Sequence, residues 1–155
     1  NVVYKRMAME DIDFPPNSFD VVISSLAFHY TSNFREICER IRSCLVPAGD
    51  FVFSVEHPLF TASGTQDWIY DAEGRPSHWP VDHYFAEGQR DTNFLGEKVA
   101  KYHKTITTYL NTLLSTGFVI TGIVEPQPAP ELLHSNPAMQ DELRRPMMLL
   151  VSAKS

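Results

Sequence analysis

The sequence is poor in cysteine, and its two cysteines exclude a disulfide framework. Cys38 and Cys44 lie six residues apart on one predicted helix. At a rise of 1.5 Å per residue their positions are about 9 Å apart along the helix axis, which is too far for a disulfide. They form neither a CxxC pair nor half of a zinc site. We therefore expect two buried thiols in a reducing cytoplasm.

Basic charge and long apolar runs are also scarce. The chain has 13 Lys and Arg against 19 Asp and Glu, which gives a formal net charge of −6. Because phosphate-rich partners require a basic field, this balance disfavours nucleic acid and anionic membranes as partners. No apolar run approaches the roughly 20 residues needed to cross a bilayer, and no signal-peptide pattern opens the chain. These absences predict a cytoplasmic protein without a membrane or nucleic-acid partner.

Paired glycines are missing as well. The seven glycines stand at 49, 64, 74, 88, 96, 117 and 122, and none forms Gly-x-Gly. The sequence therefore contains no tight paired-glycine turn of the kind that lets a backbone approach a nucleotide closely. The spacing of His78 and His83 does not match common zinc sites, so no metal is expected. A length of 155 residues is enough for one domain with a core, which we place over residues 1–155.

The clearest pattern lies in residues 14–57. Residues 19–24 form a continuous apolar run with three β-branched residues, which predicts a strand buried on both faces by helices. Apolar residues at helical spacing predict a helix over 34–45, with Ser32 or Asn33 as its cap. Pro47 and Gly49 end it, and residues 51–55 read as a second buried strand. This order predicts a right-handed crossover unit of a parallel sheet.

The second half of the chain returns to regular periodicity after an irregular stretch. We predict a helix over 97–116 that ends at Gly117 and strands over 118–124 and 147–153. Between these strands, after Pro130, we predict one or two short helices, with Asn136 as a cap and Pro137 at the first helical position. Residues 2–4 read as a short β-type run. On the predicted helix, Tyr102 and Tyr109 share a buried face and His103 is exposed.

Residues 58–96 are irregular, punctuated by glycine and proline, and rich in aromatic residues. A segment of this length without periodicity is typical of a functional lid or binding loop, and its aromatic content argues against disorder. We therefore expect an aromatic lid that forms a substrate-binding insertion. Its aromatic residues are Phe60, Trp68, Tyr70, Trp79, Tyr84, Phe85 and Phe94.

Three short motifs resemble those of a known family. Ser18-Phe19-Asp20-Val21-Val22, Leu45-Val46-Pro47-Ala48-Gly49 and Ala8-Met9-Glu10-Asp11-Ile12-Asp13-Phe14 resemble landmarks of class I S-adenosylmethionine-dependent methyltransferases. The likeness covers residues 2–57 and 97–153 and is greatest to the small-molecule enzymes typified by the ubiquinone/menaquinone-biosynthesis group. It implies an α/β fold with a Rossmann-like sheet of parallel strands and a C-terminal antiparallel strand. The first strands of that fold are lacking, so residues 1–155 are expected to form a partial domain.

The resemblance also implies S-adenosylmethionine as cofactor and the residues that hold it. Ala8, Met9 and Glu10 match the adenine side, and Ser24, Ser25 and Leu26 match the loop that touches the methionine part. Ala8 stands where the family has an acidic residue that accepts a hydrogen bond from the adenine amino group. Only the backbone contact of Met9 then remains there. Open α/β sheets bind ligands at this edge because the crossovers part there and leave a crevice.

The candidate catalytic residues lie in two places, directly after the second predicted strand and in the loop after the first. Methyl transfer is a displacement from a sulfonium, so the protein mainly aligns the reacting groups and needs a base only for an acceptor that must lose a proton. His57 and His29 are the candidate catalytic residues. Loop anchoring is the alternative for His57, and packing or capping is the alternative for His29. The candidate substrate-binding residues are Tyr30, Glu56, Trp68, Trp79 and Arg75.

Two functions are consistent with these features. The first is methyl transfer from S-adenosylmethionine to a small, partly apolar molecule, for which this chain supplies the adenine, methionine and substrate sides of the site. The alternative is a non-catalytic methyltransferase-like module that binds or dimerises. Because no Gly-x-Gly loop is present, we expect the 155-residue chain alone to be inactive or nearly so. An uncovered sheet edge would favour a homodimer through that edge.

Overall fold

The structure, a computed structural model, describes residues 2–94 and 96–155. Asn1 and Leu95, which fall within the predicted 1–155 domain and the 58–96 segment, lie outside the described residues. The strands are β1 (Phe19–Ser25), β2 (Leu45–Glu56), β3 (Ile69–Tyr70), β4 (Pro76–His78), β5 (Gly88–Phe94), β6 (Glu97–His103), β7 (Val119–Val124) and β8 (Met148–Lys154). The α-helices are α1 (Phe34–Cys44), α2 (Pro58–Thr61), α3 (Ile106–Ser115) and α4 (Pro130–Ser135), and the 3-10 helices are η1 (Met9–Asp11), η2 (Phe28–Tyr30) and η3 (Pro137–Arg144).

Four strands form a mixed central sheet in the order β1-β2-β8-β7. β1 and β2 are parallel and are joined through α1, as the crossover pattern predicts. β8 is antiparallel to both β2 and β7. The structure therefore confirms the predicted α/β sheet of parallel strands with a C-terminal antiparallel strand.

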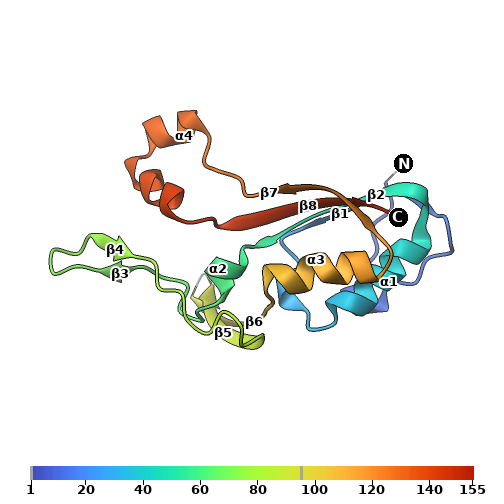
Figure 1. Ribbon diagram of the computed structural model, residues 1–155, viewed down its shortest axis with the longest axis horizontal. Helices are drawn as coiled ribbons and strands as arrows, with labels where there is room; N and C mark the ends of the chain where they lie inside the picture. The colour runs from blue at the N-terminus through green and yellow to red at the C-terminus, as the bar shows by residue number, and fades with distance from the viewer. Residues whose placement is uncertain (1, 95) are drawn as a thin grey trace.

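The core lies between this sheet and the helices α1 and α3, which cover one of its faces (Figure 1). Phe28, at the loop after β1, packs edge-to-face on Phe34 and Phe53 with ring centroids 5.3 and 5.4 Å apart. Aromatic pairs in this geometry stabilise a core beyond the area they bury. The other core residues are Ile37, Cys38, Ile41, Leu45, Phe51, Val55, Tyr109, Leu113, Phe118, Leu149, Val151 and Ala153.

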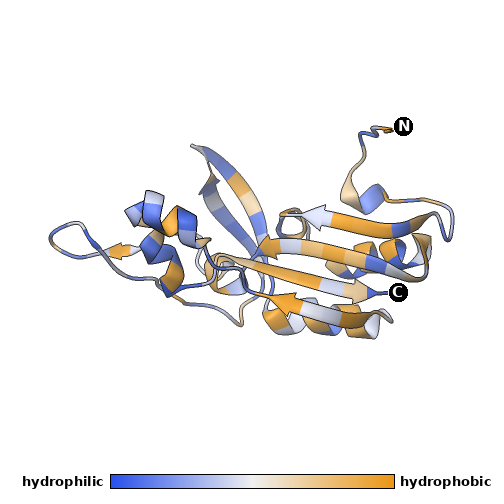
Figure 2. Ribbon diagram, turned by 90° about the horizontal axis from the view of Figure 1, so that it is seen from above, coloured by the Kyte–Doolittle hydropathy of each residue, from blue (hydrophilic) through white to orange (hydrophobic). Residues whose placement is uncertain are grey.

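The opposite face of the sheet carries no helix among the described residues. Figure 2 shows this face with α1 and α3 behind it. Val21 and Ile23 of β1 are 49% and 73% exposed on it, and Val119 and Val124 of β7 are also exposed. We call these four residues the open sheet face. The prediction that β1 is buried on both faces is therefore wrong for the described residues, because both helices pack on the same side.

The helix predicted over 97–116 is divided into two elements. Residues 97–103 form β6, which pairs antiparallel with β5, and α3 begins only at Ile106. In β6 the alternate residues Lys101 and His103 point inward and are each 1% exposed, so the predicted exposure of His103 is wrong. Tyr109 is buried as predicted, but Tyr102 lies on the strand and not on the same helix. The predicted β-type run at residues 2–4 forms no strand.

The predicted helix ends are largely confirmed. Gly117 has φ +88°, a conformation that favours glycine, and the N–H of Phe118 returns to the carbonyl of Leu113 at 3.0 Å to close α3. Asn136 caps η3 by accepting the N–H of Ala138 at 3.2 Å. Asn33 stands at the start of α1 but makes no side-chain cap bond.

The long connections gather at one edge of the sheet. β1, β2 and β7 all end there, and β8 begins there, so residues 57–103 and 125–147 leave the sheet side by side. In Figure 1 the β3–β4 hairpin and the α4–η3 connection both extend away from this edge. Within residues 2–94 and 96–155, no helix has the length and apolarity that crossing a membrane demands.

Candidate active site

A closed ring of three polar side chains lies where β2 ends. Lys101 Nζ is 2.6 Å from Glu56 Oε1 and 2.9 Å from Gln66 Oε1, and the amide of Gln66 donates to Glu56 Oε2 at 2.9 Å. The Lys101 side chain is 1% exposed and that of Glu56 is 15% exposed. A charge this deeply buried requires a partner, and each side chain here supplies one to the others. We call Glu56, Gln66 and Lys101 the polar ring.

Each member of the polar ring comes from a different segment. Glu56 is the last residue of β2, and the strand alternation of β6 directs Lys101 inward. Gln66 has φ +49°, a strained conformation for a residue other than glycine. Such strain persists where surrounding contacts enforce it, and it is common at functional sites. The Lys101 ammonium also lies 6.0 Å from the ring centroid of Tyr30 and 5.4 Å from that of Phe94.

His29 holds the end of β2 against the loop that follows β1. Its Nδ1 accepts the backbone N–H of Glu56 at 3.2 Å, and the residue is 2% exposed. Burial lowers the pKa of His29 to about 4; the carboxylate of Glu56 opposes this shift, while the charges of Lys101 and Lys104 add to it. The ring is therefore neutral at neutral pH. Since Nδ1 is occupied, the neutral ring carries its proton on Nε2 and is a donor there.

His57 begins α2. Its Nδ1 accepts the N–H of Leu59 at 3.0 Å, which caps the helix. Its buried Nε2 lies 2.9 Å from Glu125 Oε1 but makes no hydrogen bond within the described residues. Burial lowers the pKa of His57 more than Glu125 raises it. The structure thus gives His57 the anchoring contacts that sequence analysis named as its alternative. Neither His29 nor His57 presents a free imidazole lone pair to a substrate.

The residues matched to the cofactor lie on the β1 side of the same edge. Leu26 turns the chain away from the sheet with φ +49°, and its N–H donates to the carbonyl of Ser54 at 2.9 Å. Ser24 and Ser25 precede it at the end of β1. Glu10, in η1, accepts the hydroxyl of Thr31 at 2.5 Å, and this bond lowers the pKa of Glu10. The Ala8–Glu10 turn is therefore tied to the loop after β1.

Three of the aromatic residues from the 58–96 segment enclose an arginine from the distant 125–147 connection. The guanidinium carbon of Arg145 lies 4.0 Å from the ring centroid of Trp79, 5.0 Å from Phe60 and 5.2 Å from Trp68. Phe60 and Trp79 are stacked, with centroids 5.0 Å apart. We call these three rings the aromatic cage. Sequence analysis named both tryptophans as substrate-binding residues but not Arg145.

Arg75 is not brought to this cluster. It lies at the turn of the β3–β4 hairpin, where it pairs with Asp71 at 2.9 Å and Glu73 at 3.1 Å, and its side chain is 72% exposed. Arg144 instead reaches that hairpin: it donates to the carbonyls of Pro76 and Ser77 and pairs with Asp141. The hairpin and the 125–147 connection are thereby joined.

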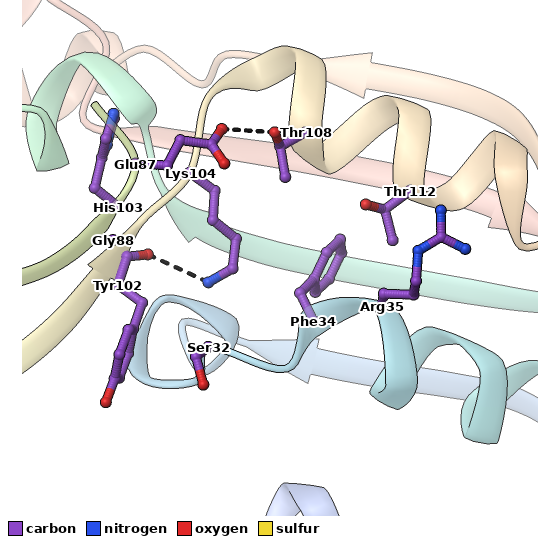
Figure 3. A pocket seen from close by; sticks show the side chains of 10 residues that line it. All are labelled: Ser32, Phe34, Arg35, Glu87, Gly88, Tyr102, His103, Lys104, Thr108 and Thr112. Atoms are coloured by element: carbon purple, nitrogen blue, oxygen red, sulfur yellow. Dashed lines mark hydrogen bonds between the residues drawn. The ribbon is translucent and has the colours of Figure 1, made fainter. Parts of the chain in front are cut away.

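A cavity of about 440 Å³ lies on the helix side of the same edge (Figure 3). The Lys104 ammonium donates to the carbonyls of Thr31, Phe28 and Tyr102, and burial lowers the pKa of Lys104 to about 8. Glu87 accepts the N–H and hydroxyl of Thr105 and the hydroxyl of Thr108, which caps α3. The charged groups that line this cavity are thus taken up by contacts within the protein.

Sequence reasoning missed three buried residues of this region: Gln66, Lys101 and Lys104. The prediction of a helix over 97–116 did not place the side chains of Lys101 and Lys104 in the interior, and both lysines were therefore missed. The alternation Val99-x-Lys101-x-His103 has a period of two and was the available signal for a strand. Gln66 carried no signal, since its role depends on a local backbone conformation.

Known proteins share the sequence and the fold of this chain. Residues 1–53 match the family model described as a methyltransferase domain. The structure aligns with that of a Listeria monocytogenes protein named a "putative S-adenosylmethionine dependent methyltransferase", with 54% identity and a TM-score of 0.93 over 99% of this chain and 68% of that one. An S-adenosylmethionine-dependent methyltransferase from Mesorhizobium loti aligns with 41% identity and a TM-score of 0.89 over 98% of this chain and 69% of that one.

A curated relative extends the comparison. An uncharacterised protein of Haemophilus influenzae is 32% identical over 143 residues, which is 92% of this chain and 56% of the relative. The chain thus spans little more than half the length of this relative. From its identity to the Listeria and Mesorhizobium proteins, and from the sheet they share, the chain belongs to the S-adenosylmethionine-dependent methyltransferases with a Rossmann-like α/β fold.

Proposed function

We propose that the protein transfers a methyl group from S-adenosylmethionine to a small, partly apolar acceptor at the carboxyl edge of β1 and β2. The observation that carries the proposal is the convergence of two sets of residues at that edge. The Leu26 turn and the Glu10–Thr31 contact lie on the β1 side, and the polar ring lies at the end of β2. A crevice of this kind is where open α/β sheets bind their ligands.

The residues of this chain fit one side of the cofactor. Ser24 and Ser25 place hydroxyl groups at the end of β1, and Leu26 bends the backbone outward beside them. The Ala8–Glu10 turn, held by Thr31, offers backbone groups for the adenine side. The sequence shown contains no Gly-x-Gly turn for the ribose side. When bound, the cofactor supplies an electrophilic methyl group on a sulfonium.

Glu56 is the group we assign to the acceptor. Lys101 and Gln66 occupy one lone pair of each of its carboxylate oxygens, and each oxygen has a second lone pair. These two contacts hold the Glu56 carboxylate in place. Because 15% of the side chain is exposed, the carboxylate is still open to a ligand. An N–H or O–H of the acceptor would donate to Glu56 and be oriented for attack. In this scheme His29 and His57 hold the edge in place rather than move protons.

The experiment is a calorimetric titration of the complete gene product, and of this chain alone, with S-adenosylhomocysteine. We expect Ser25→Trp, which fills the edge, to abolish binding by the complete protein. The matched control Ser43→Trp, exposed on α1, should bind like the unaltered protein. Absence of binding by the complete protein, or equal binding by both variants, would contradict the proposal. For the 155-residue chain alone we expect weak or no binding.

A further inference from the structure

A second cavity lies outside the polar ring, between the 58–96 segment and the 125–147 connection. Its volume is about 280 Å³, and its lining residues include Leu59, Trp68 and Trp79 from one segment and Arg144 and Arg145 from the other. Residues that are distant in sequence therefore enclose one space. In Figure 1 these segments converge beyond α2.

This cavity is connected to the polar ring through Phe60 and Trp79. The amide of Gln66 donates to Glu56 at 2.9 Å and lies 3.5 Å from the carbonyl of Phe60. Phe60 stacks on Trp79, whose indole N–H donates to the carbonyl of Leu59 at 3.2 Å. The cavity and Glu56, the residue that we assign to the acceptor, are thus joined by a continuous chain of contacts.

Arg145, which lines this cavity, has an unmet hydrogen-bonding requirement. Its side chain is 6% exposed, and its two terminal nitrogens pair with Glu142 at 2.7 and 3.3 Å. Its Nε–H is buried and has no partner among the described residues. A buried N–H on a charged group that lacks an acceptor is destabilising. Since native structures rarely leave such a group unpaired, the missing acceptor points to a ligand.

The charge of the cavity favours an anion over a cation. Aromatic rings arranged like the cage attract cations, but Arg145 already occupies their faces. Arg144, whose guanidinium carbon lies 4.5 Å from the Trp68 centroid, pairs with Asp141, and Arg145 pairs with Glu142. Neither carboxylate is among the residues that line the cavity, so the lining presents the two guanidinium groups, which disfavour a second cation there. A carboxylate matches the planar guanidinium, and a flat apolar ring matches the indole surfaces.

We propose that this cavity is the acceptor subsite and that it selects a small planar molecule bearing an anionic group, with Arg145 receiving the anion. The identification of the bound molecule as the methyl acceptor rests on the proposed function. The inference that the cavity binds a planar anion does not depend on that function. A small rotation of the Arg145 side chain would bring Nε–H to the ligand, a scale of adjustment that is common on binding.

The test is a calorimetric comparison of three probes of similar shape: benzoate, neutral benzamide and cationic benzylammonium. We expect benzoate to bind at least about tenfold more tightly than benzamide, a difference of roughly 1.4 kcal/mol, and benzylammonium to bind most weakly. Equal affinities for benzoate and benzamide, or no benzoate binding at about 10 mM, would overturn the proposal. This ranking needs no variant, so it remains decisive if an arginine substitution disturbs folding.

A variant series locates the site. Arg145→Met should weaken benzoate at least about tenfold and leave benzamide nearly unchanged, and Arg145→Lys should restore only part of the loss because lysine lacks the planar fork. Arg40→Met, exposed on α1, is the matched control and should bind benzoate normally. Unchanged benzoate affinity in a folded Arg145→Met protein would refute the assignment. Titration with S-adenosylhomocysteine is run separately, so that failure of methyl transfer and failure of this subsite are distinguishable.

Discussion

At the scale of single residues, Lys101 is the residue whose loss should cost most. Lys101→Met leaves the Glu56 carboxylate partly buried without its cation, and breaking such a pair costs about 3–5 kcal/mol. We expect the free energy of unfolding in urea to fall by that amount. Replacing Glu56 with Gln in the same protein should recover part of the loss, because no buried charge then remains unpaired.

Lys98→Met provides the matched control. Lys98 lies on the same strand but is exposed, so its substitution should change stability by less than about 0.5 kcal/mol. Equal stability of the Lys98→Met and Lys101→Met proteins would show that the polar ring contributes nothing to folding.

His29 should make stability depend on acid. Burial lowers its pKa from an ordinary value of 6.5 to about 4 in the folded state, so between these pH values the unfolded chain binds more protons. The stabilisation is present above pH 6.5 and is lost as the pH falls toward 4; the shift corresponds to about 3 kcal/mol. His29→Asn keeps an acceptor for the Glu56 N–H and should flatten the decline. The measurement is the free energy of unfolding in urea, for the unaltered and His29→Asn proteins, at several pH values between about 4 and 6.5.

The comparison for this prediction is His83→Asn. The His83 side chain is 76% exposed and lies in water in both states, and asparagine tolerates its φ of +54°. If the two variants lose stability with the same slope as the unaltered protein, His29 is not the origin of the acid sensitivity.

At the scale of secondary structure, α3 depends on a carboxylate from a different element. Glu87 receives three donors at the first turn of the helix and complements its dipole. Glu87→Ala should destabilise the protein by about 1–2 kcal/mol and speed amide exchange in the first turn of α3. Glu97→Ala, exposed on β6, is the control. Unaltered exchange at Ile106 and Tyr109 in the Glu87 variant would argue against this cap.

The elements that sequence analysis identified are those with strong local signals. The apolar run before Ser24, the helical spacing from Phe34 and the glycine at 117 were each sufficient to place an element end within a few residues. The 97–103 segment was misassigned because Val99 and Tyr102 have helical spacing, while the inward positions of the strand, Lys101 and His103, are polar. Pairing with β5, which local spacing does not encode, decides between helix and strand.

The residues of the candidate site show the same contrast between local sequence signals and tertiary packing. Glu56, Tyr30 and the two tryptophans follow strands or lie in an irregular segment, so chain position alone indicated them. Arg145 and Lys101 meet them only through tertiary packing, and residues 45 or more apart in the chain carry no joint signal in one sequence. The roles of His29 and His57 also depended on which ring nitrogen was already occupied, which spacing cannot reveal.

At the scale of the whole molecule, the open sheet face predicts self-association of the isolated chain. Within the described part of the chain β1 is an edge strand, and exposed β-branched residues beside such an edge favour pairing with another copy. Sedimentation velocity of the 155-residue chain should show a dimer, and Ile23→Lys should weaken it at least about tenfold. Leu114→Lys, at a residue that is also apolar and exposed but lies on the helix layer, should leave the dimer intact. A monomer at all concentrations would contradict the prediction.

The aromatic cage gives the protein a built-in optical reporter. The sequence contains two tryptophans, and both belong to the cage, so the indole emission of the whole chain originates beside Arg145. A shift in emission wavelength or intensity on adding a compound would thus report on that place alone. Collisional quenching by iodide, an anion, against acrylamide, a neutral molecule, would reveal the sign of the local charge without any substitution or label.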